Sequence, residues 1–132
     1  MMNESWKRKQ PLARTNDGKL VTVRFQDWEC QILMQRYEQN GTPALQLVDE
    51  EGTVARATAN QPGVTLPPGE LLIKDYSENK GMLAALIEAG VVSDTGKRIQ
   101  SEYAELVIAT LAPEILEQWR RYQIESDGPS IG

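Results

Sequence analysis

Residues 21–48 read VTVRFQDWECQILMQRYEQNGTPALQLV, and this stretch decides the fold class. Apolar and polar residues alternate over residues 21–25 and again over residues 28–34, as they do along strands with one buried face. The dipeptide Asn40-Gly41 then precedes a third apolar run at residues 44–48. Asn-Gly suits a type I′ turn, in which both central residues have positive φ. The stretch therefore predicts three consecutive antiparallel strands.

One face of these strands is expected to build the core. The side chains predicted to point inward are those of Val21, Val23, Phe25, Trp28, Cys30, Ile32, Met34, Leu45 and Leu47. An acidic turn at residues 49–52 should lead into a fourth strand over residues 54–58. Residues 60–69 hold three prolines and two glycines, which predicts an exposed loop.

The second half of the chain alternates strand and helix signals. Residues 71–73 and 103–111 are apolar enough for buried strands, and residues 93–96 predict a turn. Ser77 is the expected N-cap of a helix that ends at Gly90, and a second helix should begin near Pro113. The apolar stripes of these helices are Met82, Leu83, Leu86 and Ile87 in the first and Ile115, Leu116, Trp119 and Tyr122 in the second.

These elements predict an α+β fold, in which an antiparallel meander of about five to six strands packs against two helices. A length of 132 residues fits one domain. We expect that domain to span residues 18–125, after a flexible basic arm at residues 1–17 and before a tail at residues 126–132.

Charge is distributed unevenly along the chain. The first 24 residues hold six basic and two acidic side chains, whereas the remainder holds eight basic and seventeen acidic ones. An acidic body disfavours nonspecific nucleic-acid binding, which needs clustered Lys and Arg against phosphate, and suits a basic partner. Nucleic-acid contact is therefore expected only through the arm.

Cysteine usage and hydropathy favour a cytoplasmic protein. The lone Cys30 has no second cysteine with which to form an internal disulfide. No apolar signal core follows the basic N-terminal residues, and no window approaches the ~18 apolar residues that span a bilayer. We expect neither secretion nor a membrane partner.

The chain contains no histidine, which excludes imidazole chemistry within it. Cys30 lies on a predicted inward face, where a thiol is usually an inert apolar group. No phosphate-binding glycine motif or calcium loop is present, so we expect no cofactor and no enzyme. The alternative is carboxylate-dependent catalysis, for which Asp75 and Glu78 are the candidates.

Three polar surfaces are candidates for binding a partner. Trp6 lies in the basic arm beside Lys7, Arg8 and Lys9, and tryptophan is frequent among interface hot spots. Asp49, Glu50 and Glu51 form the densest acidic run. Asp75, Tyr76 and Glu78 form a polar group at a predicted helix start, where free N–H groups attract anions but these carboxylates repel them.

Residues 73–92 read IKDYSENKGMLAALIEAGVV. This segment resembles small uncharacterised proteins encoded by bacteria, phages and plasmids, and Lys80 stands where an acidic residue is more usual. The resemblance covers about a sixth of the chain and implies a bacterial or mobile-element origin but no reaction.

Together these features predict a small non-enzymatic protein-binding module. In the sharper form of this hypothesis the module is a phage- or plasmid-encoded inhibitor that docks its acidic surface on a host defence or DNA-binding protein. A homodimer and a nucleic-acid binder that uses the arm are the remaining alternatives.

Overall fold

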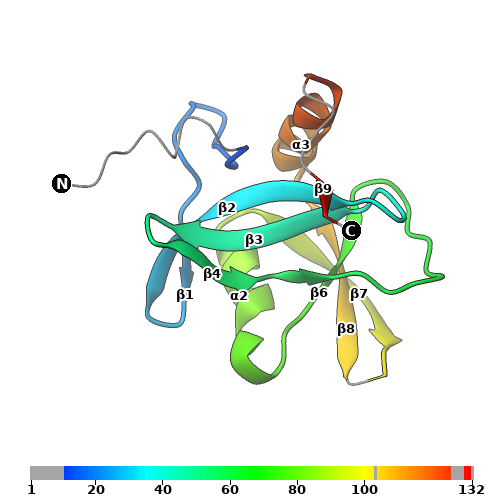
Figure 1. Cartoon of the computed structure of the whole chain (residues 1–132). Coiled ribbons are helices and arrows are strands. Elements are labelled where there is room, and N and C mark those ends of the chain that lie inside the picture. The colour runs from blue at the N-terminus through cyan, green and yellow to red at the C-terminus, as the bar shows by residue number, and fades with distance from the viewer. Residues whose placement is uncertain (1–10, 103, 126–129, 132) are drawn as a thin grey trace.

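The computed structural model describes residues 11–102, 104–125 and 130–131. Over these residues the fold is α+β, with two antiparallel sheets and two α-helices (Figure 1). The first sheet has the order β1-β2-β3-β4 and the second the order β5-β6-β8-β7. The strands are β1 (Val23–Phe25), β2 (Trp28–Tyr37), β3 (Pro43–Asp49), β4 (Gly52–Arg56), β5 (Thr58–Ala59), β6 (Glu70–Ile73), β7 (Val92–Gln100) and β8 (Glu105–Leu111), with β9 (Ser130–Ile131) parallel to β2.

The expected meander is confirmed for β1–β4, but the chain then enters a second sheet. Ala57 forms the corner: its N–H donates to the carbonyl of Leu45 in β3 (2.9 Å), and its own carbonyl accepts from the N–H of Lys74 after β6 (2.9 Å). The strand predicted over residues 54–58 is therefore split between β4 and β5. The expectation of a single meander was wrong. The chain changes its hydrogen-bonding partner from β3 to β6 here, and such a change does not alter the alternation of apolar and polar side chains from which the meander was predicted.

The hairpin between β2 and β3 has the predicted position but a different turn. Its loop comprises residues 38–42, and the N–H of Gly41 donates to the carbonyl of Tyr37 (2.8 Å). Gly41 has φ 72°, whereas Asn40 is not among the residues with positive φ. The turn is therefore not type I′. Asn40 instead accepts hydrogen bonds from the N–H and hydroxyl of Thr42 through its side chain.

Strand β7 replaces the turn expected at residues 93–96. The register against β8 shifts between Asp94 and Lys97, so these residues form a bulge within a continuous strand. Thr95 fixes the bulge by donating its hydroxyl proton to the carbonyl of Ile108 (2.6 Å). Most β7 side chains are exposed at the edge of the sheet, which removes the apolar alternation that would have revealed the strand.

Both helices exist, but the first begins later than predicted. Ser77 starts the 3-10 helix η1 (Ser77–Asn79), and α2 (Met82–Glu88) has Gly81 at its N-cap with φ 95°. Ser77 is thus not the N-cap of the α-helix. Gly90 ends α2 as expected: its N–H donates to Ile87, and the next N–H, from Val91, donates to Leu86.

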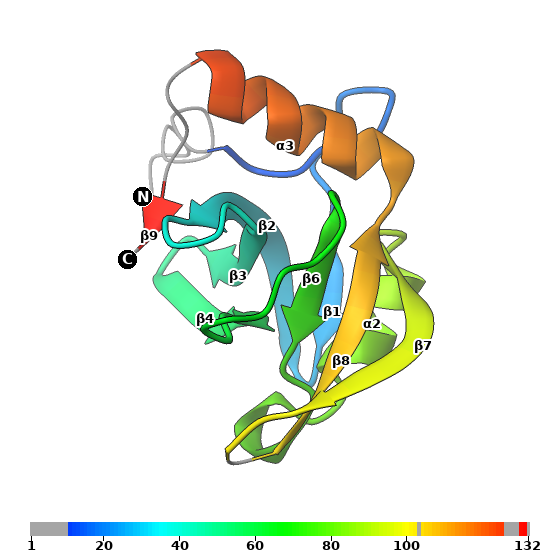
Figure 2. The same ribbon diagram turned by 90° about the vertical axis from the view of Figure 1, so that its right-hand side faces the viewer.

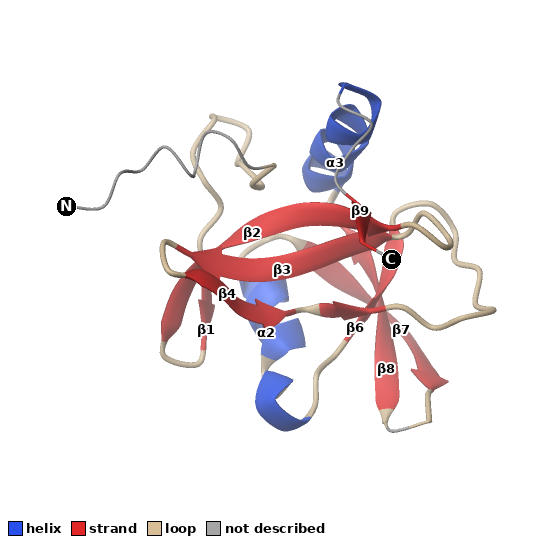
Figure 3. Cartoon of the chain, in the orientation of Figure 1, coloured by secondary structure: helices blue, strands red, loops and turns tan. Residues whose placement is uncertain are grey.

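Helix α3 (Pro113–Glu125) begins at the predicted proline and lies across one end of the strands, while α2 lies beside β1 and β7 (Figures 2 and 3). Trp119 anchors α3 to the first sheet by donating its indole N–H to the carbonyl of Gln35 (2.6 Å). One large apolar core joins both sheets and both helices. Within the described residues, neither helix is long and apolar enough to cross a bilayer.

Part of the expected arm belongs to the folded body. Leu12 and Ala13 are buried, and the N–H of Ala13 donates to the carbonyl of Ile32 in β2 (2.9 Å). Met34 likewise donates its N–H to the carbonyl of Pro11 (2.9 Å). Residues 11–13 therefore pair with β2, because Leu12 and Ala13 supply apolar contacts that are not evident from the polar composition of residues 1–17.

Candidate functional site

Trp28 is the side chain whose position differs most from expectation. It has the same strand parity as the buried Cys30 and Ile32, yet 48% of its surface is exposed. The pairing of β2 with β3 begins at Gln31, and β3 ends at Asp49, so β2 projects two residues beyond the end of β3. Trp28 therefore lies past the edge of the core, and the prediction that it points into the core is wrong.

Trp28 borders a groove of about 300 Å³, which we call the Trp28 groove. Three segments line it: the β1–β2 hairpin, β4, and the connection between β6 and α2. The lining residues are Phe25, Gln26, Trp28, Val54, Ala55, Arg56, Lys74, Glu78 and Asn79. Its size falls at the lower end of the range for ligand pockets.

The groove exists because β4 and the chain after β6 separate beyond the Ala57 corner. Asn79 spans the gap: its side-chain amide donates to the carbonyl of Arg56 (2.7 Å) and, at 3.3 Å, to that of Lys74. Asn79 is only 4% exposed. One buried amide thus joins the end of β4 to the chain after β6 within the groove lining.

Two strained residues flank this groove. Within the described part of the chain, Gln26 (φ 54°) and Ser77 (φ 52°) are the non-glycine residues with positive φ. Gln26 lines the groove, and Ser77 directly precedes Glu78, which also lines it. The side-chain amide of Gln26 donates to the carbonyl of Glu78 (2.9 Å), which ties the two walls together. Such conformations cost about 1 to 3 kcal/mol each and are frequent at functional sites.

An acidic end adjoins the groove. We give this name to Asp27, Glu29, Asp49, Glu50 and Glu51, which lie in or beside the β1–β2 and β3–β4 turns at the same end of the first sheet (Figure 1). The pKa of the Cys30 thiol is raised to about 11, first by burial and then by the nearby charges of Asp49 and Glu29. Side chains from both turns therefore act on the same buried group.

The structure places the candidates from the sequence in different surroundings. Asp49 is the last residue of β3 and accepts from the N–H of Glu51 (2.9 Å), while Glu50 and Glu51 form the β3–β4 turn and are exposed. Tyr76 packs on a small apolar cluster around Leu72, so it has a structural role. Trp6, Lys7, Arg8 and Lys9 lie outside the described residues.

Asp75 has a structural role as well. Its carboxylate accepts hydrogen bonds from the N–H groups of Gly81 (3.1 Å) and Leu83 (3.0 Å), so it caps α2 from a distance. Glu78 is exposed and lines the Trp28 groove, but Asp75 does not line it. The two carboxylates considered for catalysis therefore do not share this groove.

Four of the residues that line the groove were not identified from the sequence: Gln26, Arg56, Lys74 and Asn79. One signal could have identified the groove's exposed edge. In the antiparallel pairing of β2 with β3, Gln31 lies opposite Val48. Trp28 precedes Gln31 by three residues and Glu51 follows Val48 by three, so the same register would place Trp28 opposite Glu51. Glu51 is in the predicted turn, where no strand covers a neighbouring side chain.

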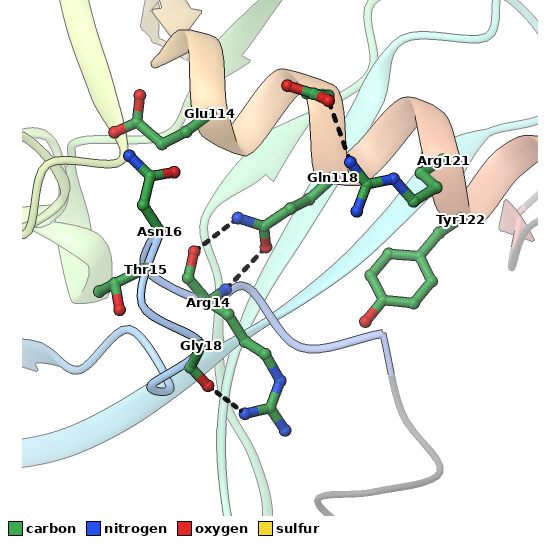
Figure 4. Close-up of a pocket in the computed structure, with 9 residues that line it drawn as sticks. Arg14, Thr15, Asn16, Gly18, Glu114, Gln118, Arg121 and Tyr122 are labelled. Carbon is green, nitrogen blue, oxygen red and sulfur yellow. Dashed lines mark hydrogen bonds and ion pairs between the residues drawn. The ribbon is translucent and has the colours of Figure 1, made fainter.

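A wider hollow of about 690 Å³ lies between residues 14–18 and α3 (Figure 4). Gln118 bonds both the N–H (2.8 Å) and the carbonyl of Arg14, and the Arg14 guanidinium donates to the carbonyl of Gly18 (2.7 Å). Arg121 pairs with Glu117 at 3.0 Å. Several polar groups that line this hollow thus bind one another, and the Arg14–Gln118 pair fastens the N-terminal segment to α3.

Comparison with protein-family models, curated proteins and solved structures finds no match to this chain. Within the described residues, no three Asp, Glu or Cys side chains come together as a set of metal ligands.

Proposed function

We propose that this chain is a non-enzymatic protein-binding module that acts in the cytoplasm and contacts its partner through the Trp28 groove. The observation that carries the proposal is the half-exposed Trp28 at the mouth of a groove whose walls are joined through Gln26 and Glu78. Tryptophan combines a large apolar surface with a hydrogen-bond donor and is enriched among residues that dominate binding energy.

The acidic end supplies the polar rim of this surface. Its carboxylates attract a partner with basic side chains and speed encounter, an effect that salt weakens. The resemblance to mobile-element proteins suggests a more specific version of this proposal, in which the partner is a host protein and the module inhibits that protein by binding it. This proposal keeps the partner-binding role expected for Asp49, Glu50 and Glu51. They form the rim of a site that is centred on Trp28.

The test compares three full-length proteins as baits in the native host extract: wild type, Trp28→Ala and Ile87→Ala. Ile87 is the matched control because it is a large apolar residue on α2 with 43% of its surface exposed. We expect a partner that the wild type and Ile87→Ala retain and Trp28→Ala loses by at least tenfold in quantitative mass spectrometry. Equal recovery by all three baits would reject the Trp28 groove as the contact surface.

Single-stranded nucleic acid is the second candidate ligand, because Arg56 and Lys74 line the same groove as Trp28. Bases stack on aromatic side chains while cations contact the backbone. The acidic end opposes this alternative. A fluorescence titration with oligonucleotides at low and moderate salt distinguishes the two, since a protein-binding module gives no saturable quenching at either salt concentration.

A further inference from the structure

The open side of the Trp28 groove is a strand edge. Among the described residues β4 pairs with β3 alone and ends the order of the first sheet. The carbonyl of Arg56 points away from β3, because it accepts the amide of Asn79 on the far side. Val54 and Ala55 line the groove from the same strand. An extended peptide could therefore pair with β4 inside the groove.

The charges along this edge have a fixed polarity. Asp49, Glu50 and Glu51 precede β4. Among the residues that line the groove, Arg56 and Lys74 outweigh the single carboxylate of Glu78, so the lining itself carries a net positive charge. Five strand residues span about 13 Å, so the two charged groups are separated by roughly one short added strand. A peptide with opposite charges at its two ends would meet a complementary charge at each end.

We propose that the Trp28 groove takes an extended segment of the partner protein as an added strand antiparallel to β4. An acidic residue near the N-terminus of the segment lies beside Arg56 and Lys74, and a basic residue near its C-terminus lies beside Glu50 and Glu51. An apolar side chain between them packs on Trp28. The antiparallel direction is favoured because antiparallel pairing is the more stable per residue. This inference rests on the proposed function and names the chemistry of the partner.

The test uses two end-capped synthetic peptides of identical composition, ETVTVK and KVTVTE, titrated into the full chain. The readouts are calorimetry and the amide NMR shifts of β4. We expect ETVTVK to bind about tenfold more tightly than KVTVTE and to shift the amides of Val54 to Arg56. Trp28→Ala should weaken the binding of ETVTVK, and Ile87→Ala should not.

A charge-reversed variant tests the polarity directly. The variant reverses the charge at both ends of the β4 edge and leaves the core residues unchanged. It combines the substitutions Glu50→Lys, Glu51→Lys, Arg56→Glu and Lys74→Glu. This variant should prefer KVTVTE, with circular dichroism confirming its fold. A preference for ETVTVK that survives the reversal would overturn the charge argument.

The other outcomes are equally decisive. Tighter binding of KVTVTE to the wild type overturns the antiparallel direction. Concentration-dependent β4 shifts without peptide identify a second copy of the chain as the occupant and overturn the proposal. If neither peptide binds but Trp28→Ala still loses the cellular partner, the strand-addition model fails while the protein-binding function stands.

Discussion

At the scale of single residues, the buried thiol of Cys30 makes stability depend on alkaline pH. Its pKa in the folded protein is about 11, against an ordinary value of 9.0. Between these values the unfolded chain loses the proton and the folded chain keeps it, so the unfolded state binds fewer protons. The free energy of unfolding should therefore fall as pH rises from about 9 to about 11, by about 2 to 3 kcal/mol in all. Urea denaturation at a series of pH values measures this slope.

Cys30→Val is the matched control, since it keeps an apolar side chain of similar size and removes the proton. Burial also raises the pKa of Tyr37, but that phenol contributes only near and above its ordinary value of 10.0. Between about pH 9 and pH 10 the difference between the two proteins thus isolates the thiol. Parallel stability curves for wild type and Cys30→Val would contradict the assignment.

Asn79 is the residue on which the shape of the groove depends. Asn79→Ala leaves the carbonyls of Arg56 and Lys74 without their shared donor in a buried position. We expect a loss of about 1 to 3 kcal/mol in the free energy of unfolding, measured by urea denaturation. Asn16→Ala removes an exposed amide of the same type and should change stability by less than about 0.5 kcal/mol. Equal effects of the two substitutions would mean that Asn79 does not brace the groove.

At the scale of elements, α2 depends on a capping group outside its own sequence. The helix has seven residues, and Gly81 at its N-cap carries no side chain. Asp75→Ala removes the acceptor for two N–H groups and should cost about 1 to 2 kcal/mol of stability. Thermal unfolding followed by circular dichroism provides the measurement.

Glu78→Ala is the control for that experiment, because Glu78 is an exposed carboxylate in the same connection. Its loss should change stability by less than about 0.5 kcal/mol. If Glu78→Ala destabilised the fold as much as Asp75→Ala, general charge effects rather than the cap would explain the result. Partner capture adds a second comparison, since Glu78 lines the groove and Asp75 does not.

Elements with one buried face were predictable from side-chain spacing, and elements defined by their neighbours were not. Val23, Cys30 and Ile32 are buried as alternation predicts, and α3 begins at the expected Pro113. Strand β7 was missed because its side chains are mostly exposed at a sheet edge. The start of α2 was misplaced because its capping carboxylate lies outside the spacing of an ordinary capping box.

The groove required knowledge of the whole molecule. Trp28, Arg56 and Asn79 come from three segments, and only the corner at Ala57 brings them together. The sequence revealed the acidic turn at residues 49–52, because a run of carboxylates is visible without tertiary contacts. The alternation of apolar and polar residues assigned Trp28 to the core. Alternation predicts the face of the sheet on which a side chain lies, but it does not show whether the neighbouring strands extend far enough to cover that side chain.

The Ala57 corner also makes a prediction about how the molecule unfolds. Both sheets contribute to one buried cluster, in which Leu45 and Leu47 of the first sheet join Leu71 and Ile73 of the second. Because neither sheet has a separate core of comparable size, they should open in one cooperative step. The slowest-exchanging amides of β3 and β8 should therefore have the same opening free energy in native-state hydrogen exchange.

A core substitution in one sheet sharpens this prediction. Leu71 is fully buried in β6, so Leu71→Ala should lower stability by about 2 to 5 kcal/mol through lost contacts and a residual cavity. If the sheets form one unit, the opening free energies of the slow amides in β3 and β8 fall by the same amount. A fall confined to β8 would mean that the second sheet opens alone. The Trp28 groove would then join two units able to separate, because β4 belongs to the first sheet and Lys74 follows β6 of the second.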